Sequence, residues 1–316
     1  MMLVLVMENS SHITSFVFTV FQEMGPIRYF YFCVILMMYI SIIFANSLLV
    51  GLICAERSLH EPMYLFVCSL CVNELYGSTA LYPALLVNML TDVHEISKDK
   101  CILQIFCIIS YGTIELCNLA VMAYDRYVSI YHPLKYRLIM TPAKVSVFIS
   151  IVWIYSVIKV SITVSMTARL PLCSNTVNKV YCDNYSLVKL SCISTTAVNV
   201  YGLAGLFLTV FGLSFLIVYS YGKILRVCLT SEESRKKALK TCAPHLASLM
   251  NFSLASAFEL VQSRFDLSHV PAALRVFVSV YFLMISPLLT PLIYGLRNTK
   301  IRTVFKKNYS AKLFPK

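Results

Sequence analysis

Charged residues are scarce in this chain of 316 residues. Asp, Glu, Lys and Arg together make up only 13% of the sequence, whereas hydrophobic residues make up 58%. A soluble protein ordinarily carries about a quarter charged residues. The composition therefore excludes a water-soluble globular domain and indicates a membrane protein.

Catalytic and metal-binding signatures are also missing from the sequence. It contains no His-Glu-x-x-His or Gly-x-Ser-x-Gly segment, and its six histidines form no pair at metal-ligand spacing. The paired broken spans of a transporter and the polar lining of a channel are not found either. We therefore expect neither an enzyme, a transporter nor a channel, and we predict no cofactor and no firm metal site.

Long apolar stretches recur along the chain. Each has roughly the 20 residues that a helix needs to cross a hydrocarbon core of about 30 Å. The stretches are too long for barrel strands, so spanning helices must bond their own backbone groups inside lipid. The sequence predicts an all-α membrane protein, a seven-transmembrane helix bundle that forms a single domain over residues 1–316. The expected spans are Tyr31–Leu52, Tyr64–Leu86, Ile102–Tyr124, Val145–Met166, Val198–Ser220, Leu239–Leu260 and Leu274–Leu296.

Basic residues are distributed unevenly between the expected loops. With the amino terminus outside, eighteen Lys and Arg fall on the inner side and eight on the outer side. Since Lys and Arg concentrate in cytoplasmic loops, we expect residues 1–28 outside the cell and residues 297–316 in the cytoplasm of a multi-pass plasma-membrane protein. The net charge of +12 then reflects topology in a lipid bilayer, and no nucleic-acid partner is expected.

The segment after the last span has a helical pattern of its own. Beyond Asn298, the apolar residues Ile301, Val304 and Phe305 are spaced i, i+3, i+4, with basic residues elsewhere. This spacing is typical of a helix that lies on an anionic lipid surface. We expect a short cytoplasmic amphipathic helix here.

Four cysteines lie on the expected outer side. The longest outer connection, Thr167–Thr196, is the only one able to form a lid and contains Cys173, Cys182 and Cys192, while Cys101 precedes the third span. Disulfides persist in this oxidising environment, and four cysteines allow three pairings.

Two Asn-x-Ser segments on the outer side are expected glycosylation sites. Asn9 and Asn184 each stand two residues before a serine. Two further matches, at Asn251 within a span and Asn308 in the cytoplasmic tail, are interpreted as chance.

Polar residues end the third span. Asp125, Arg126 and Tyr127 stand where a helix of hydrocarbon length runs out, and a basic loop with Pro133 follows. Charges are tolerated at this boundary because their head groups reach water. Asp125 is placed to hold Arg126 in a local pair until another group competes for the guanidinium. We interpret the pair as a latch on a membrane receptor.

Glu74, Glu115 and Lys159 are ionisable residues that lie well inside the expected spans. Glu74 and Glu115 must be paired, protonated or hydrated, because an ionised carboxylate in hydrocarbon costs several kcal/mol. Lys159 in the fourth span either marks a site or snorkels to the outer interface.

Five segments in order carry a family resemblance. They are Leu59–Tyr64, Met122–Tyr136, Ser220–Tyr221, Lys237–Leu246 and Pro287–Asn298. With them the chain resembles the odorant receptors of the rhodopsin-like G-protein-coupled class over nearly its whole length. The resemblance implies a receptor that binds a small-molecule odorant in the outer half of the bundle and activates a heterotrimeric G protein, expected to be the olfactory stimulatory type that raises cAMP. The alternative is a rhodopsin-like receptor for a non-odorant small ligand or a peptide.

The resemblance also implies roles for individual residues. It implies the disulfides Cys101–Cys182 and Cys173–Cys192. The residues implied in activation and G-protein coupling are Asp125, Arg126, Tyr127, Tyr221, His245, Pro291 and Tyr294. The residues at a depth suited to a compact ligand are Ile108, Ile109, Gly112, Tyr201, Phe252, Ser253, Ser256, Glu259 and Tyr281. Glu259, near the mouth of the bundle, either attracts polar ligands or only interacts with loop residues and solvent.

The family fold would bring Glu74 and Glu115 together beside Asn46. This group is interpreted either as a sodium or proton site that biases the inactive state, or as a neutral, hydrogen-bonded pair of acids that serves packing.

The chain departs from the family pattern at four positions. Ala45 stands where glycine is usual, and Glu74 where aspartate is common. Thr290 replaces an asparagine before Pro291, and Ser253 replaces an aromatic residue in the sixth span. The last two alter the expected activation switch.

Overall fold

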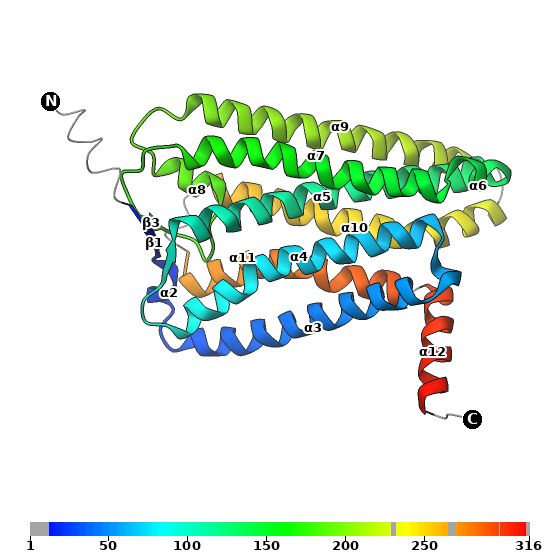
Figure 1. Ribbon diagram of the computed structural model, residues 1–316, viewed down its shortest axis with the longest axis horizontal. Helices are drawn as coiled ribbons and strands as arrows, with labels where there is room; N and C mark the ends of the chain where they lie inside the picture. The colour runs from blue at the N-terminus through cyan, green and yellow to red at the C-terminus, as the bar shows by residue number, and fades with distance from the viewer. Residues whose placement is uncertain (1–12, 229–231, 265–269, 297, 314–316) are drawn as a thin grey trace.

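The computed structural model describes residues 13–228, 232–264, 270–296 and 298–313. Its long helices lie side by side along one axis and form a bundle (Figure 1). Within the described residues these helices are α3 (Ile27–Ala55), α4 (Pro62–Leu90), α5 (Lys98–Tyr131), α7 (Pro142–Ala168), α9 (Thr196–Cys228), α10 (Glu232–Arg264) and α11 (Ala272–Pro291). Each of them contains most of one expected span.

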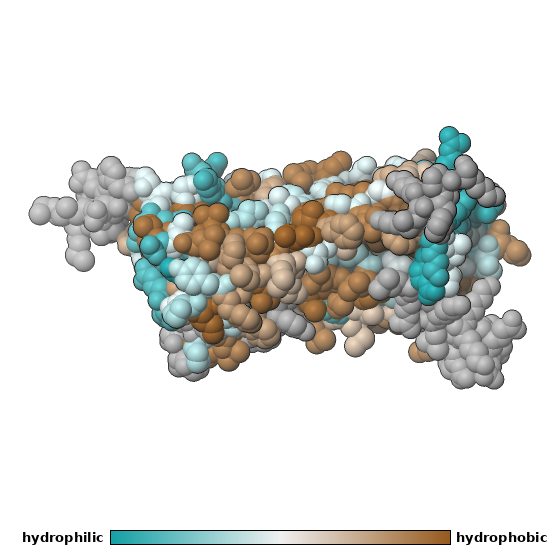
Figure 2. Space-filling view, turned by 90° about the horizontal axis from the view of Figure 1, so that it is seen from below, coloured by the Kyte–Doolittle hydropathy of each residue, from teal (hydrophilic) through white to brown (hydrophobic). Residues whose placement is uncertain are grey.

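Membrane-spanning character is clear for four of these helices. The segments long and apolar enough to cross a membrane are Ile27–Ala55, Lys98–Tyr131, Pro142–Ala168 and Thr196–Arg226. Apolar residues cover the middle of the bundle on the face seen in Figure 2, and hydrophilic residues gather towards its two ends. Large apolar side chains point outward, for example Phe44, Ile154 and Phe215, which are 64%, 59% and 70% exposed. A surface of this kind fits lipid rather than water.

Proline and a cap fix where helices begin. Pro62 and Pro142 occupy the first turns of α4 and α7, where the missing N–H is not needed and φ suits a helix. Thr141 precedes α7, and its hydroxyl accepts from the Lys144 backbone N–H at 3.3 Å. This contact satisfies one of the donors that the first turn leaves free.

One end of the bundle, here called the strand end, carries a small sheet that the all-α expectation missed. Its strand order is β2-β1-β3, with β1 (Ser15–Phe18) between β2 (Glu95–Ser97) and β3 (Thr176–Val177). β1 pairs antiparallel with β2 and parallel with β3. Strands of two to four residues are too short to show a two-residue periodicity in the sequence. The sheet joins three connections that are far apart in the chain.

Short helices fill the connections. They are α2 (Val20–Glu23) and α8 (Asn184–Lys189) at the strand end, and η1 (Arg57–Leu59), η2 (Pro133–Lys135) and α6 (Tyr136–Ile139) at the other end. The buried side chains form a large cluster near each end. Phe16 and Tyr82 belong to the strand-end cluster, and Phe66 and Tyr294 belong to the opposite one.

The last helix, α12 (Thr299–Leu313), turns away from the bundle axis (Figure 1). The end of the bundle from which it leaves is here called the α12 end. Ile301 and Val304 are 3% and 9% exposed, as the predicted amphipathic pattern requires. Asn298 caps the helix, because its side-chain oxygen accepts from the Lys300 N–H at 3.0 Å. The prediction of a short helix after the last long one is confirmed.

Candidate functional site

The α12 end of α5 carries a buried charge pair. Asp125 and Arg126 are 1% and 8% exposed. Arg126 Nε donates to Asp125 Oδ2 at 3.0 Å, and Arg126 Nη2 contacts the same oxygen. The second carboxylate oxygen accepts from the Tyr136 hydroxyl of α6 at 2.7 Å. The carboxylate therefore bonds both the guanidinium and the following loop.

Tyr136 is a functional candidate that the sequence did not single out. It is the last residue of the Met122–Tyr136 segment. Burial, reinforced by the Asp125 carboxylate, raises the pKa of Tyr136 above its ordinary value. Its hydroxyl therefore stays protonated and donates to Asp125.

A second polar contact at this end links three helices. His245 of α10 contacts the Leu119 carbonyl oxygen of α5 through Nε2 at 2.9 Å, and its Nδ1 contacts the Tyr221 hydroxyl of α9. A carbonyl only accepts, so Nε2 carries a hydrogen and donates to Leu119. The rings of Tyr221 and His245 also stack, with centroids 5.7 Å apart. His245 therefore links α5, α9 and α10 through its two ring nitrogens.

The end of α11 brings Pro291 and Tyr294 to the same region. After Pro291 the chain continues as a wider π-helical turn, η3 (Leu292–Leu296), in which Tyr294 is 1% exposed. The hydroxyls of Tyr294 and of Ser248 in α10 are buried and have no hydrogen-bond partner among the described residues. Unpaired buried hydroxyls are costly, so this part of the α10–η3 contact is polar and loosely satisfied.

Halfway along the bundle, two buried carboxyl groups share a network. Glu74 of α4 accepts from the Tyr111 hydroxyl at 2.8 Å and from the Thr290 hydroxyl at 3.1 Å. Glu115 of α5 accepts from the Asn73 amide at 3.0 Å. Thr290 therefore bonds α11 to α4.

Gly77 makes this network sterically possible. A Cβ atom at this position would lie 2.6 Å from the Tyr111 ring. The glycine in α4 therefore allows the close approach that brings the Tyr111 hydroxyl to Glu74.

Asn46 of α3 bonds backbone carbonyl groups, and its position beside the two glutamates stays a prediction. Its amide donates to the carbonyl oxygens of Ile42 and Pro287, both at 2.9 Å. Pro291, four residues after Pro287, has no N–H to donate to that carbonyl. Asn46 supplies the missing donor, so its hydrogen bonds hold α3 to α11 rather than reach either glutamate. Among the described residues, no group of three His, Cys, Asp or Glu side chains is arranged to hold a metal ion.

Both disulfides implied by the resemblance are present at the strand end. Cys101 and Cys182 have Cα atoms 5.5 Å apart, and Cys173 and Cys192 have Cα atoms 5.1 Å apart. The Cys182 N–H also donates to the Gln104 side-chain oxygen at 2.9 Å. The long connection is thus fixed to α5 and closed on itself.

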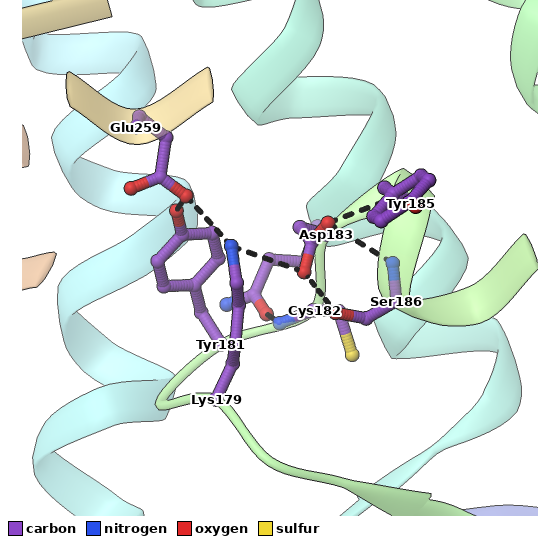
Figure 3. A network of polar contacts seen from close by, with 8 residues as sticks. Lys179, Tyr181, Cys182, Asp183, Tyr185, Ser186 and Glu259 are labelled. Carbon is purple, nitrogen blue, oxygen red and sulfur yellow. Dashed lines mark hydrogen bonds and ion pairs between the residues drawn. The ribbon is translucent and has the colours of Figure 1, made fainter. Parts of the chain in front are cut away.

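An ion-pair network ties this loop to α10 (Figure 3). Lys179 Nζ lies 2.8 Å from Glu259 Oε1 and 3.4 Å from Asp183 Oδ2, and the Tyr181 hydroxyl also bonds Glu259. Asp183 in addition accepts from the Tyr185 N–H at 3.0 Å, which caps α8. Of the two roles left open for Glu259, the structure shows the contact with loop residues.

The charges in this network change the proton affinity of Lys179 and Tyr181. Burial lowers the pKa of Lys179, but Asp183 and Glu259 together outweigh it and raise that pKa above 10.5. Burial, with Glu259 next, raises the pKa of Tyr181. Lys179 is therefore charged and Tyr181 neutral over the physiological range. Lys179 has no recognisable signal in the sequence, whereas Asp183 stands in the N-cap position before α8.

The expected ligand residues lie on α5, α9, α10 and α11, and those whose side chains are described differ in exposure. Phe252 is 8% exposed, whereas Tyr201 is 37% exposed and Ser253 is also exposed. Half-buried positions are Ile108, Ile109, Gly112, Ser256 and Glu259. The side chain of Tyr281 lies outside the described residues.

Two hollows in the described part of the chain are lined by other residues. One, of about 490 Å³, lies between the strand ends of α5 and α7, and the other, of about 580 Å³, lies between α5, α7 and α9. None of the nine expected ligand residues lines either of them.

The predicted glycosylation sites have separate outcomes. Asn184 is half-buried at the start of α8, where its side-chain oxygen accepts from the Thr167 hydroxyl at 2.8 Å. Asn9 lies outside the described residues. Glycosylation of both stays a prediction.

Comparison with known proteins fits these features. The olfactory receptor family matches residues 32–312. The chain belongs to the olfactory receptor family. Olfactory receptor 8A1 of Homo sapiens is 32% identical over 308 residues, which are 97% of this chain and 94% of the relative. Olfactory receptor 4B13 of Mus musculus is 31% identical over 97% of this chain and 99% of its own length. Olfactory receptor 52D1 of Homo sapiens is 34% identical over 84% of this chain and 85% of its own length.

Membership agrees with the prediction made from the five sequence segments. It makes the chain a multi-pass membrane receptor rather than an enzyme. In this olfactory receptor the quoted Met122–Tyr136 segment provides the buried pair at the end of α5, and the Pro287–Asn298 segment provides η3 and the cap of α12.

Proposed function

We propose that this receptor binds a small-molecule odorant in the strand-end half of a seven-transmembrane bundle and activates a heterotrimeric G protein at its α12 end. The G protein is of the olfactory stimulatory type, so activation raises cAMP. Family membership and the relatives' names support the odorant class. Under this proposal the bundle resides in the plasma membrane, with the strand end outside the cell.

The observation that carries the proposal is the attachment of α10 at two points along its length. Near the strand end, Glu259 bonds the lid residues Lys179 and Tyr181. Near the α12 end, His245 bonds the α5 backbone and Tyr221. Fourteen residues of helix separate the two, a length of about 21 Å. A ligand that displaces the lid therefore changes the restraint on a helix that also packs beside Arg126.

Activation then follows from a shift between two arrangements. In the resting arrangement Asp125 and Tyr136 hold Arg126 at the end of α5. Movement of the inner part of α10 breaks the His245 contacts and frees Arg126 to pack against the G protein. A ligand shifts this equilibrium only by its difference in affinity for the two arrangements.

The two buried carboxyl groups set the resting bias. Glu74 and Glu115 share a proton or hold sodium beside Thr290 of α11, and this favours the inactive packing. Changing sodium at fixed pH, and pH at fixed sodium, separates the two cases in a basal-activity assay. Insensitivity to both would leave the pair with a packing role.

The central test is an odorant screen in cells that express the receptor with a cAMP reporter. At least one odorant should raise cAMP in the wild type and fail to do so in cells expressing Arg126→Ala at the same surface density. A response to a peptide or hormone, with no response to odorants, would show that the ligand is not an odorant. A rise in a different second messenger would show that the G protein is of another type.

Topology is tested separately with epitope tags. A tag before Asn9 should be labelled on intact cells, and a tag after Lys316 only after permeabilisation. The reverse pattern would overturn the orientation derived from the basic residues.

A further inference from the structure

Lys159 of α7 is a cation within a spanning helix, and its bonding is incomplete. Its Nζ donates to the Thr209 hydroxyl oxygen of α9 at 2.7 Å. Among the described residues, no carboxylate lies within ion-pair distance of this ammonium group. An ammonium has three donors, so two N–H groups and the positive charge are left without a protein partner in the described part of the chain.

The hydroxyls around Lys159 cannot supply that partner. Thr209 donates its own hydrogen to the Gly205 carbonyl at 2.7 Å. Its oxygen therefore accepts from Lys159 and, at 3.1 Å, from the Tyr155 hydroxyl. The lysine stem packs over Gly205, with Lys159 Cε at the van der Waals distance of 3.8 Å from the place where a Cβ would be. The cluster offers donors and positive charge but no anion.

The cluster adjoins the hollow of about 580 Å³ between α5, α7 and α9, and Lys159 lies next to its lining rather than in it. Tyr155 and Thr209 line this groove together with apolar residues such as Phe148 and Leu216. Along α9 the lining continues from Thr209 to Ser220, a distance of about 16 Å at the helical rise. With carbon–carbon bonds of about 1.5 Å in a zigzag, roughly a dozen methylene groups fill that length.

We propose that this groove binds a long-chain fatty acid, with its carboxylate on Lys159 and its tail directed towards the α12 end. A carboxylate accepts through two oxygens, so it matches both unused N–H groups and the charge. The tail of any membrane lipid can fill an apolar groove. The preference for a fatty acid over other lipids therefore comes from the contact of its carboxylate with Lys159. This site is separate from the odorant pocket and does not depend on it.

Depth decides between a fatty acid and a phospholipid. Lys159 is nine residues before the end of α7 at Ala168, which is about 14 Å along the helix. A phospholipid headgroup stays in the interfacial region, so it does not reach Lys159. A single-chain carboxylate carries its head directly on the tail and fits this position.

The groove also contacts the activation region. Tyr127, which follows Arg126, and Ser220, which precedes Tyr221, both line it. A bound tail packs between α5 and α9 at these residues. Occupancy therefore stabilises one arrangement of the two helices beside the latch.

The experiment uses the full receptor in phosphatidylcholine nanodiscs and tetradecanoic acid with a photoactivatable diazirine near the end of its tail. Crosslinking should be saturable, and peptide mapping should place it near Leu216–Ser220. Unlabelled tetradecanoic acid should compete, whereas its methyl ester should compete at least tenfold less well. Lys159→Gln should reduce labelling at least tenfold, because it removes the charge and keeps a polar side chain.

Two matched variants separate the site from general lipid contact. Gly212 lines the groove and has open space at its Cβ position, so Gly212→Leu should fill the groove and reduce labelling. Gly51 of α3 has similar open space and lies outside the groove, so Gly51→Leu should label like the wild type. If Lys159→Gln lowers the yield of folded receptor, Gly212→Leu alone tests the site.

Three results would overturn the proposal. Equal competition by the methyl ester would mean that the carboxylate is not recognised. Unchanged labelling in Lys159→Gln or in Gly212→Leu would mean that bulk lipid occupies the groove. Loss of labelling in Lys144→Gln with none in Lys159→Gln would mean a headgroup at the α12 end, since Lys144 lies over the Phe148 ring there.

Discussion

The two ends of the bundle each carry a partly or fully buried ion pair, and the pairs differ in how they are made. At the α12 end, Asp125 and Arg126 are neighbours in sequence on one helix. At the strand end, Lys179 and Glu259 are 80 positions apart and join a loop to α10. A pair within one helix is not pulled apart when helices move, so a displaced neighbouring helix releases it only by allowing the side chains to change conformation. A pair between two elements breaks when those elements separate.

The difference suggests a division of labour. Under the proposed function, the Lys179–Glu259 pair breaks when the loop and α10 separate, whereas the Asp125–Arg126 pair determines whether the guanidinium is free. Experiments on each end sharpen or break this contrast.

The largest effect is expected for the disulfide that fixes the lid. Cys101→Ser and Cys182→Ser should each remove surface receptor or odorant response, because loss of a native disulfide costs about 2–5 kcal/mol. The double variant should be little worse than either single one. Flow cytometry of surface receptor measures this, with Cys33→Ser, an exposed free cysteine, as the control. Additive, independent losses would show that the two residues do not act as one bond.

Next in size is the loss of the guanidinium. Arg126→Ala should reduce ligand-evoked cAMP to background while surface receptor stays measurable, because it removes the guanidinium that we propose packs against the G protein. Arg57→Ala, an exposed arginine at the same end, should respond like the wild type. Full signalling by Arg126→Ala at normal density would make this arginine only an interface anchor.

Weakening the Asp125–Arg126 pair should raise signalling rather than lower it. Asp125→Asn should raise ligand-independent cAMP per surface receptor, because a charge-assisted hydrogen bond of about 1.5–3 kcal/mol is weakened. Tyr136→Phe should raise it less, since it removes a single donor and leaves the charge pair. If Tyr136→Phe raised ligand-independent cAMP as much as Asp125→Asn or more, this would contradict the arrangement in which Asp125 holds Arg126 and Tyr136 supports Asp125.

The smallest effect is expected at the strand end. A double-mutant cycle with Lys179→Met and Glu259→Gln should give a coupling of about 0.5–3 kcal/mol in thermal unfolding. The exposed pair Arg28–Asp92, in which Asp92 is 93% exposed, should give about 0–1 kcal/mol. Equal couplings would mean that the lid contact is no more than a surface ion pair.

The pH dependence of that contact follows from the raised pKa of Lys179. A raised folded-state pKa adds stability that is complete below the unfolded value and is lost as the pH rises through the folded value. The coupling should therefore be unchanged between neutral pH and pH 9, and it should fall only above about pH 10.5. A loss near neutral pH would show that Lys179 is not held by its two carboxylates.

Much of the fold and part of the candidate site were predictable because their signals are local. Apolar length gave the long helices, and the spacing of Ile301, Val304 and Phe305 gave α12. Adjacent residues gave the Asp125–Arg126 contact. The pairing of Cys101 with Cys182 was different, because the cysteines alone left three choices and only the family resemblance selected one.

Other features depend on contacts that have no local signature. The strands β1, β2 and β3 are too short to show a period, and their pairing joins three distant connections. The hydrogen bond from Asn46 to the Pro287 carbonyl has no local signature either, because it depends on the missing N–H of Pro291 on a distant helix. The partners of Glu259 were left open because Lys179 lies in a loop of irregular structure.

The sequence by itself determined that this chain lives in a membrane, that it forms long helices and that it belongs with odorant receptors. These conclusions were possible because the length of apolar stretches and the spacing of motif residues can be recognised in the linear sequence. Only the tertiary structure decided which buried polar groups meet. Each such group must find a partner once lipid and packing exclude water. For Glu74, Asn46 and Glu259 those partners come from other helices and loops, so the folded arrangement alone could choose them.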